Sequence, residues 1–197
     1  MRLTFDSIKP IADAIHAGGH AVVRDFLDAD AVSALAVECR NADLQTTAIG
    51  RGATRVERPD VRGDKTQWLH RPDASFAQRA YFQAVDALRC GLNRELMLGL
   101  DELEAHFAMY APGTRYARHR DRFRDDDARV LSSVLYLNDD WRESDGGALR
   151  LYLPDRHLDI YPSAGKLVLF LSADFEHEVL PARRDRFSIA GWFRRRA

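Results

Sequence analysis

Residues 115–123 read RYARHRDRF, and this short stretch decides how the rest of the chain is interpreted. Side chains on a β-strand alternate between its two faces. As a strand, the stretch places Ala117, His119, Asp121 and Phe123 on one face and three arginines on the other. Arginines can face water, whereas a buried charge is costly unless it is paired or binds a metal. An inward His-x-Asp pair therefore requires a partner.

A second histidine in a strand-like setting supplies the candidate partner. His177 begins the short segment HEV, far along the chain from Asp121. Spacing alone does not bring these residues together, but a jelly-roll barrel places such distant strands side by side. Two imidazoles and one carboxylate on one side of a metal form the facial triad that suits non-haem Fe(II) and leaves coordination positions open. We therefore predict an iron site made of His119, Asp121 and His177.

Composition indicates an ordinary globular protein. The chain has 197 residues, of which 46% are hydrophobic and 30% charged, so we expect a single domain over residues 1–197. A formal net charge of −1 gives no reason to expect a nucleic-acid or membrane partner. Two cysteines are too few for a disulfide framework, and the N-terminus lacks the apolar core of a signal peptide. These features predict a cytoplasmic location.

The pattern changes from helical to strand-like near residue 101. Residues 1–100 predict a helical support, and a Gly- and Arg-rich stretch at about 45–73 predicts a solvated loop or an extended two-stranded finger. Residues 101–197 alternate with period two between turn signals, which predicts a sandwich or barrel with the helices on one outer face. The core candidates of the third helix, at about 76–100, are Phe76, Ala80, Val85, Leu88 and Leu92.

A buried arginine is the second chemical feature. Alternation in DRFSIAGWF puts Arg186, Ser188, Ala190 and Trp192 on the inner face of a strand. An inward arginine needs an anion, and a guanidinium matches a carboxylate through two parallel hydrogen bonds. On the strand predicted at 130–137, Tyr136 also faces inward and can donate to the same anion. The remaining histidines are interpreted as surface or structural: His16, His20, His70, His106 and His157.

Together these segments resemble the 2-oxoglutarate- and Fe(II)-dependent prolyl 4-hydroxylases, and among them the hypoxia-inducible-factor prolyl hydroxylase group and its bacterial relatives. The resemblance covers about residues 60–193. It rests on RGDKTQW (62–68), FAMYAPGTRYARHRD (107–121), VLSSVLYLNDDW (130–141), DGGALRLY (145–152) and HEVLPARRDRFSIAGWF (177–193). His-x-Asp alone is a weak signal, but its combination with YLN, DGG-x-L and an arginine nine residues after His177 is specific.

The resemblance implies a fold and a set of roles. The fold is α+β, with a double-stranded β-helix (jelly-roll) core and N-terminal helices packed on one sheet. His119, Asp121 and His177 would be the iron ligands and catalytic centre. Residues of the 2-oxoglutarate pocket would be Arg186, Tyr136, Ser188 and Tyr110, with Leu149 also lining it. Substrate contacts would be Arg62, Asp64, Trp68, Tyr116, Arg129 and Trp192.

The implied activity is hydroxylation of a prolyl residue in a protein, with Fe(II), 2-oxoglutarate as cosubstrate, O2, and ascorbate as a stimulant. Succinate and CO2 would be released. The substrate would present its proline in an exposed loop, and a translation factor is one candidate. Two alternatives stay open: the same chemistry on a small molecule or free amino acid, and a metal-binding jelly roll without turnover. A nucleobase substrate is disfavoured because no broad basic stripe with interleaved aromatics is present.

Overall fold

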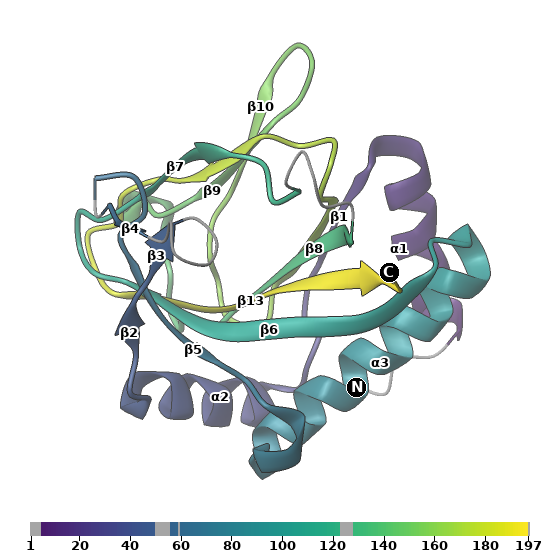
Figure 1. Cartoon of the computed structure of the whole chain (residues 1–197), viewed down its shortest axis with the longest axis horizontal. Helices are drawn as coiled ribbons and strands as arrows, with labels where there is room; N and C mark the ends of the chain where they lie inside the picture. The colour runs from purple at the N-terminus through teal and green to yellow at the C-terminus, as the bar shows by residue number, and fades with distance from the viewer. Residues whose placement is uncertain (1–4, 50–55, 59, 123–127, 197) are drawn as a thin grey trace.

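A computed structural model describes residues 5–49, 56–58, 60–122 and 128–196. Figure 1 shows the helices gathered along one side of a large curved sheet, with a smaller sheet on the other side. The helices are α1 (Phe5–Gly18), α2 (Ala29–Asn41) and α3 (Phe76–Leu96), and short 3-10 turns span Arg71–Asp73 and Glu143–Asp145. Within the described residues, no helix combines the length and apolar character needed to cross a membrane.

Two antiparallel sheets form the core. The large sheet has the order β1 (His20–Val23), β11 (Leu167–Leu171), β8 (Arg129–Tyr136), β13 (Arg186–Arg195), β6 (Leu100–Tyr110), β5 (Asp64–Trp68) and β2 (Gln45–Thr46). The small sheet has the order β10 (His157–Ile160), β9 (Leu149–Tyr152), β12 (His177–Val179) and β7 (Tyr116–His119). Apolar side chains of both sheets meet between them, including Leu149, Leu151, Val168 and Phe170. This arrangement confirms the predicted jelly-roll core.

The helices pack on the outer face of the large sheet, as predicted. Alternation along β13 sends Ile189 and Phe193 to this side, where both are fully buried. They join one apolar cluster with Leu35 of α2 and Leu88 of α3. The outer face of the large sheet packs mainly on apolar helix surface, and Arg186 and Ser188 of β13 lie on its inner face.

The stretch predicted as a finger is partly built into the large sheet. β3 (Ala48–Ile49) and β4 (Val56–Glu57) pair as a separate two-stranded hairpin, which agrees with the finger interpretation. β5, in contrast, pairs along its whole length with β6 and is therefore a sheet strand rather than loop. Residues 50–55 and 59 of the predicted finger, like Phe123 and the acidic run 125–127, lie outside the described residues.

Of the predicted core residues of α3, Phe76 is wrong and Ala80 is only half-buried. Phe76 is the first residue of the helix, directly after the Ser75 N-cap, and 85% of its surface is exposed. The buried stripe begins one position later, with Ala77, Tyr81, Phe82, Val85, Leu88 and Leu92. At a first helical turn the side chain can lie beyond the end of the contact surface, so an apolar residue there carries little information about burial.

This difference gives a stability test within one helix. Phe82→Ala should cost about 3–5 kcal/mol of unfolding free energy because the ring is 5% exposed and its removal leaves a cavity. Phe76→Ala should change it by less than about 0.5 kcal/mol. Urea unfolding followed by circular dichroism measures both, and equal losses would contradict the assigned helix face.

Candidate active site

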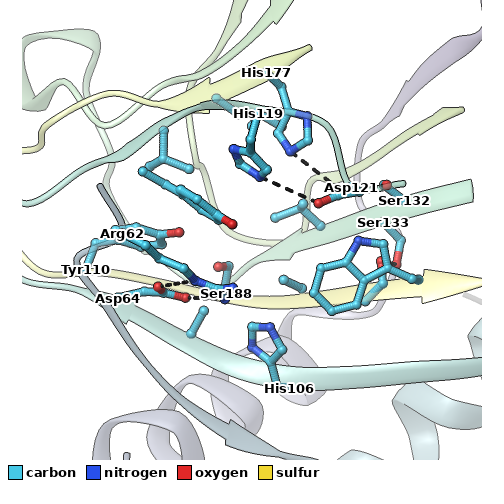
Figure 2. Close-up of a pocket in the computed structure, with 18 of the residues that line it drawn as sticks. Arg62, Asp64, His106, Tyr110, His119, Asp121, Ser132, Ser133, His177 and Ser188 are labelled. Atoms are coloured by element: carbon cyan, nitrogen blue, oxygen red, sulfur yellow. Dashed lines mark hydrogen bonds and ion pairs between the residues drawn. The ribbon is translucent and has the colours of Figure 1, made fainter. Parts of the chain in front are cut away.

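The three predicted metal ligands lie together. β12 pairs with β7 so that His177 is directly opposite His119, and Asp121 lies two residues beyond the end of β7. The Nε2 atoms of His119 and His177 are each 3.6 Å from a different oxygen of Asp121 (Figure 2). One ligand atom from each residue falls within 4.8 Å of the others. The observed strand β7 is shorter than the predicted one, because it ends at His119 and Asp121 lies on a bend.

Both imidazoles present the same nitrogen to the centre of this cluster. Nδ1 of His119 contacts the carbonyl of Ala117 at 2.8 Å, and Nδ1 of His177 contacts the carbonyl of Phe175 at 3.3 Å. A carbonyl only accepts, so each Nδ1 carries the proton and each Nε2 keeps its lone pair. Hydrogen bonds of this kind orient metal-binding histidines.

The electrostatics favour the protonation states that bind metals. Burial lowers the pKa of His177 to about 4, so this imidazole is neutral near neutral pH. Burial opposes ionisation of Asp121, but the two neighbouring histidines and a hydrogen bond from Ser132 hold the pKa of its carboxyl well below the usual range. Neutral imidazole and ionised carboxylate are the forms that coordinate a divalent cation. The cluster therefore fits such an ion.

A pocket between the two sheets leads from this cluster to a buried arginine. Its empty volume is about 510 Å³, the open mouth included. Arg186 lines it, is 1% exposed, and donates from Nε to the carbonyl of Gly147 at 2.9 Å. Among the described residues no carboxylate pairs with it. A buried cation without a counter-charge is costly, so this end of the pocket is built for an anion.

The register of the large sheet surrounds Arg186 with hydroxyl groups. Tyr110 of β6 pairs with Arg186, and Ser188 of β13 pairs with Tyr136 of β8. The Tyr110 and Tyr136 ring centroids lie 5.2 and 5.0 Å from the guanidinium carbon of Arg186. Tyr110 and Ser188 line the pocket, whereas Tyr136 lies behind the lining and is fully buried.

Tyr136 is also short of partners. Its hydroxyl makes no hydrogen bond of good geometry to a described residue. Burial raises the pKa of Tyr136 to about 12, against the opposing effect of Arg186, so the hydroxyl stays protonated and able to donate. A lone cation, an unsatisfied buried donor and a serine at one end of a pocket fit the distal carboxylate of 2-oxoglutarate.

The predicted substrate contacts divide into two groups. Arg62 and Asp64 pair through two contacts, of 2.7 and 3.0 Å, and the Arg62 guanidinium lies 4.8 Å from the centre of the Tyr116 ring. Tyr116 stacks on His119, with centroids 3.6 Å apart and planes 17° apart. All of these residues line the pocket (Figure 2). A continuous series of side-chain contacts therefore runs from Asp64, the first residue of β5, to the metal ligand His119.

The second group lies on the other flank. Trp192 lines the pocket, and the Arg129 guanidinium lies 3.7 Å from the centre of its ring while pairing with Glu104 at 2.8 Å. Trp68 is 45% exposed and packs edge-on against His106, with centroids 5.0 Å apart. Neither Trp68 nor Arg129 is part of the pocket lining itself. Both therefore flank the pocket rather than form its wall.

His106 is a pocket residue that the sequence interpretation missed. Of its two expected settings, surface or structural, the structure excludes the surface: the side chain is 2% exposed and lines the pocket between Trp68 and Trp192. The signal was present, because His106 shares its strand face with Tyr110, which the resemblance put in the pocket. Its Nδ1 contacts the carbonyl of Phe107 at 3.0 Å, and Nε2 has no hydrogen bond to a described residue.

Comparison with known proteins now identifies this geometry. The model of the 2OG-Fe(II) oxygenase superfamily matches residues 105–194, which span the metal cluster and Arg186. A crystal structure of a Pseudomonas putida prolyl-4-hydroxylase is 46% identical, with a TM-score of 0.85, and the match covers 96% of this chain and 100% of that one. The chain belongs to the prolyl 4-hydroxylase family of these oxygenases.

More distant relatives lie in the same family. A Trichoplax adhaerens prolyl hydroxylase, solved with a peptide fragment of the hypoxia-inducible factor oxygen degradation domain, is 25% identical with a TM-score of 0.85 over 96% of this chain and 90% of that one. The hypoxia-inducible factor prolyl hydroxylase of Caenorhabditis elegans is 32% identical over 68% of this chain, and human Egl nine homolog 1 is 27% identical over 95%. This chain spans only 20% and 46% of those two proteins.

Buried His106 predicts an acid-sensitive stability. Burial lowers the pKa of His106 to about 4. The unfolded chain takes up a proton below about pH 6.5, while the folded protein does not, so stability should fall as the pH drops through this window. In the metal-free protein, His106→Gln should make the loss of unfolding free energy between about pH 7 and pH 5 smaller by up to about 2 kcal/mol. His177 acts in the same direction in both proteins. Parallel urea-unfolding profiles for the two would contradict the assignment.

Proposed function

We propose that this chain hydroxylates a prolyl residue of a protein substrate, using Fe(II), 2-oxoglutarate and O2 and releasing succinate and CO2. The observation that carries the proposal is the pairing, in one pocket, of a His-Asp-His cluster with a buried arginine that has no carboxylate partner among the described residues. The 46% sequence identity with the Pseudomonas putida prolyl-4-hydroxylase, over the whole of that chain, supports the same reaction.

Each group of residues has a separate task. Nε2 of His119, a carboxylate oxygen of Asp121 and Nε2 of His177 would hold the iron on one side, which leaves its other positions open. Arg186, with Tyr136, Ser188 and Tyr110 around it, would hold the far carboxylate of 2-oxoglutarate. When bound, iron and 2-oxoglutarate supply the O2-dependent oxidation of a C–H bond.

The chain's own side chains would also shield the reacting centre from water. Apolar groups from both sheets line the pocket beside the metal cluster, namely Val134, Leu149, Phe170 and Val179. They exclude bulk water from the reacting centre, which strengthens the interactions of the charged groups within it. The histidine tautomers are already set by backbone carbonyls, so metal binding requires no proton rearrangement at the rings.

A protein substrate is favoured over a small molecule by the pocket rim. Trp68 keeps a large apolar surface exposed next to His106, and exposed aromatics of this kind anchor protein partners. The Trichoplax relative was solved with a peptide. The partner we propose presents its proline in an exposed loop, with a translation factor as the first candidate. The free thiols of Cys39 and Cys90 favour a reducing compartment, the cytoplasm, for a single catalytic domain over residues 1–197.

Succinate release tests the reaction class. The purified protein, incubated with Fe(II), 2-oxoglutarate, ascorbate and O2, should form succinate, and Asp121→Ala should not. The Asp121→Ala protein should also bind and capture the protein substrate. When the captured protein is treated with the wild-type enzyme, mass spectrometry should show that one of its prolines has gained an oxygen atom. Succinate formed only with an added amino acid or metabolite would favour the small-molecule alternative. Metal binding without any succinate would favour a non-catalytic jelly roll.

Arg186 gives the sharpest test of the cosubstrate site. Arg186→Lys keeps the charge but loses the two-pronged geometry, so the KM for 2-oxoglutarate should rise about tenfold to a hundredfold while Fe(II) affinity stays unchanged. Tyr136→Phe should act in the same direction more weakly. Arg194→Lys is the matched control, because it lies on the same strand but pairs with Glu102 outside the pocket. Unchanged KM values in both pocket variants would remove the arginine from the cosubstrate site.

Trp68 separates protein hydroxylation from cosubstrate turnover. Trp68→Ala should raise the KM for the captured protein substrate by about tenfold or more, as loss of a central aromatic anchor does. Substrate-independent conversion of 2-oxoglutarate should stay the same because the ring lies outside the pocket lining. Phe76→Ala removes another exposed aromatic, on α3, and should change neither rate. Equal loss of both activities in Trp68→Ala would show a structural role instead.

A further inference from the structure

Two buried serines form a hydrogen-bonded chain that ends on the metal-binding carboxylate. Ser132 of β8 is 1% exposed, and its Oγ lies 2.7 Å from Oδ2 of Asp121. Ser172, directly after β11, is fully buried, and its Oγ lies 2.8 Å from Oγ of Ser132. Neither serine has a place in the proposed chemistry, and their hydrogen bonds offset the cost of burying the two hydroxyls.

The direction of the chain follows from its end. An ionised carboxylate only accepts hydrogen bonds, so the Ser132 hydroxyl must donate to Oδ2. Its single proton is then used, and the contact with Ser172 must take its proton from Ser172. The Ser132 oxygen is therefore polarised by one hydrogen bond while it gives another, an arrangement in which both bonds strengthen.

The two serines stand on a more rigid support than the carboxylate does. β8 and β11 pair along their length, and the backbone N–H of Ser172 donates to the carbonyl of Val130 at 3.0 Å. Asp121, in contrast, lies beyond the end of β7 on a bend, held there by a 3.4 Å contact between its carbonyl and Arg129. The side chain of Asp121 is thus located from the large sheet, across the pocket from its own strand.

The two carboxylate oxygens have different surroundings. Oδ1 lies 3.6 Å from Nε2 of His119 and Oδ2 lies 3.6 Å from Nε2 of His177, but only Oδ2 also accepts the hydrogen bond from Ser132. A carboxylate bound through both oxygens would take a second coordination position. Of six positions, the triad would take three and a 2-oxo acid bound through two oxygens would take two, so one would be left for O2. Binding through both oxygens would fill it.

We propose that Ser132, backed by Ser172, is a positioning residue that keeps Asp121 bound through one oxygen, and so keeps the last coordination position free for O2. The hydrogen bond from the hydroxyl holds Oδ2 and orients the carboxylate so that Oδ1 is the ligand. This inference rests on the proposed function, because it presumes that the cluster holds Fe(II) and 2-oxoglutarate.

The test uses Ser132→Ala and metal ions, without any protein substrate. Calorimetry with Mn(II) should give an affinity about 10–100-fold below wild type, as loss of a hydrogen bond to a metal ligand does. The second measurement uses nitric oxide, which occupies the O2 position. Without oxygen, wild type loaded with Fe(II) and 2-oxoglutarate should give the high-spin iron–nitrosyl signal in electron paramagnetic resonance. Ser132→Ala should lose most of that signal, and Ser132→Thr, which keeps the hydroxyl, should restore it.

Ser133→Ala is the matched control. Ser133 is the next residue on the same strand and equally buried, but its hydroxyl donates to the carbonyl of Gly191 at 3.3 Å instead. It should keep the Mn(II) affinity of wild type. Ser172→Ala, which leaves Ser132 in place, should reduce the nitrosyl signal less than Ser132→Ala does, and serves as the test if Ser132→Ala fails to fold in thermal unfolding of the metal-free protein.

The outcomes are distinct. A normal nitrosyl signal in Ser132→Ala overturns the inference, even if metal affinity falls, because the sixth position would still be open. If Ser133→Ala lost as much Mn(II) affinity and nitrosyl signal as Ser132→Ala, the inference would also be overturned, because the effect would then come from packing. Failure of wild type to bind Mn(II) at all would instead refute the proposed function.

Discussion

The antiparallel pairing of β7 with β12 is the constraint on which the site depends. The pairing of these short strands puts His177 opposite His119, so their register decides that the two imidazoles meet. Asp121 lies past the end of the ladder, so it is reached from the other sheet by Ser132. The metal cluster is therefore one of the places where polar contacts join the two sheets, and the apolar core between them keeps their separation constant.

Two buried charges are treated differently within the same interior. Asp121 is surrounded by two imidazoles and a hydroxyl, whereas Arg186 has only a carbonyl as its hydrogen-bond acceptor among the described residues. The Arg186 end of the pocket therefore favours binding of an anion, whereas the Asp121 end does not. The face of the large sheet that packs on the helices contributes to an apolar core instead. Stability and chemistry are in this way assigned to opposite faces of one sheet.

Local patterns predicted the faces of strands well, because period two is a property of each strand. Arg186, Ser188 and Trp192 were found on the predicted face without knowledge of any neighbour. What could not be predicted depends on partners distant in sequence. The pairing of β5 with β6, which turns part of the finger into sheet, is one example, and the burial of His106 is another. An imidazole is compatible with surface and core alike, so only the observed register decides its place.

The strand β13 carries the functional positions at every second residue from Arg186 to Trp192. It is paired on both sides for most of its length, by β6 and by β8, and so cannot stretch or slide. At about 3.4 Å per residue, Arg186 and Trp192 are separated by roughly 20 Å. Arg186 lies on this stiff strand, and the two histidines of the metal cluster lie on β7 and β12. Because all three strands are held in sheets, the separation between the anion end and the metal end of the pocket is fixed, and an acid that bridges both ends must match it in length as well as in charge.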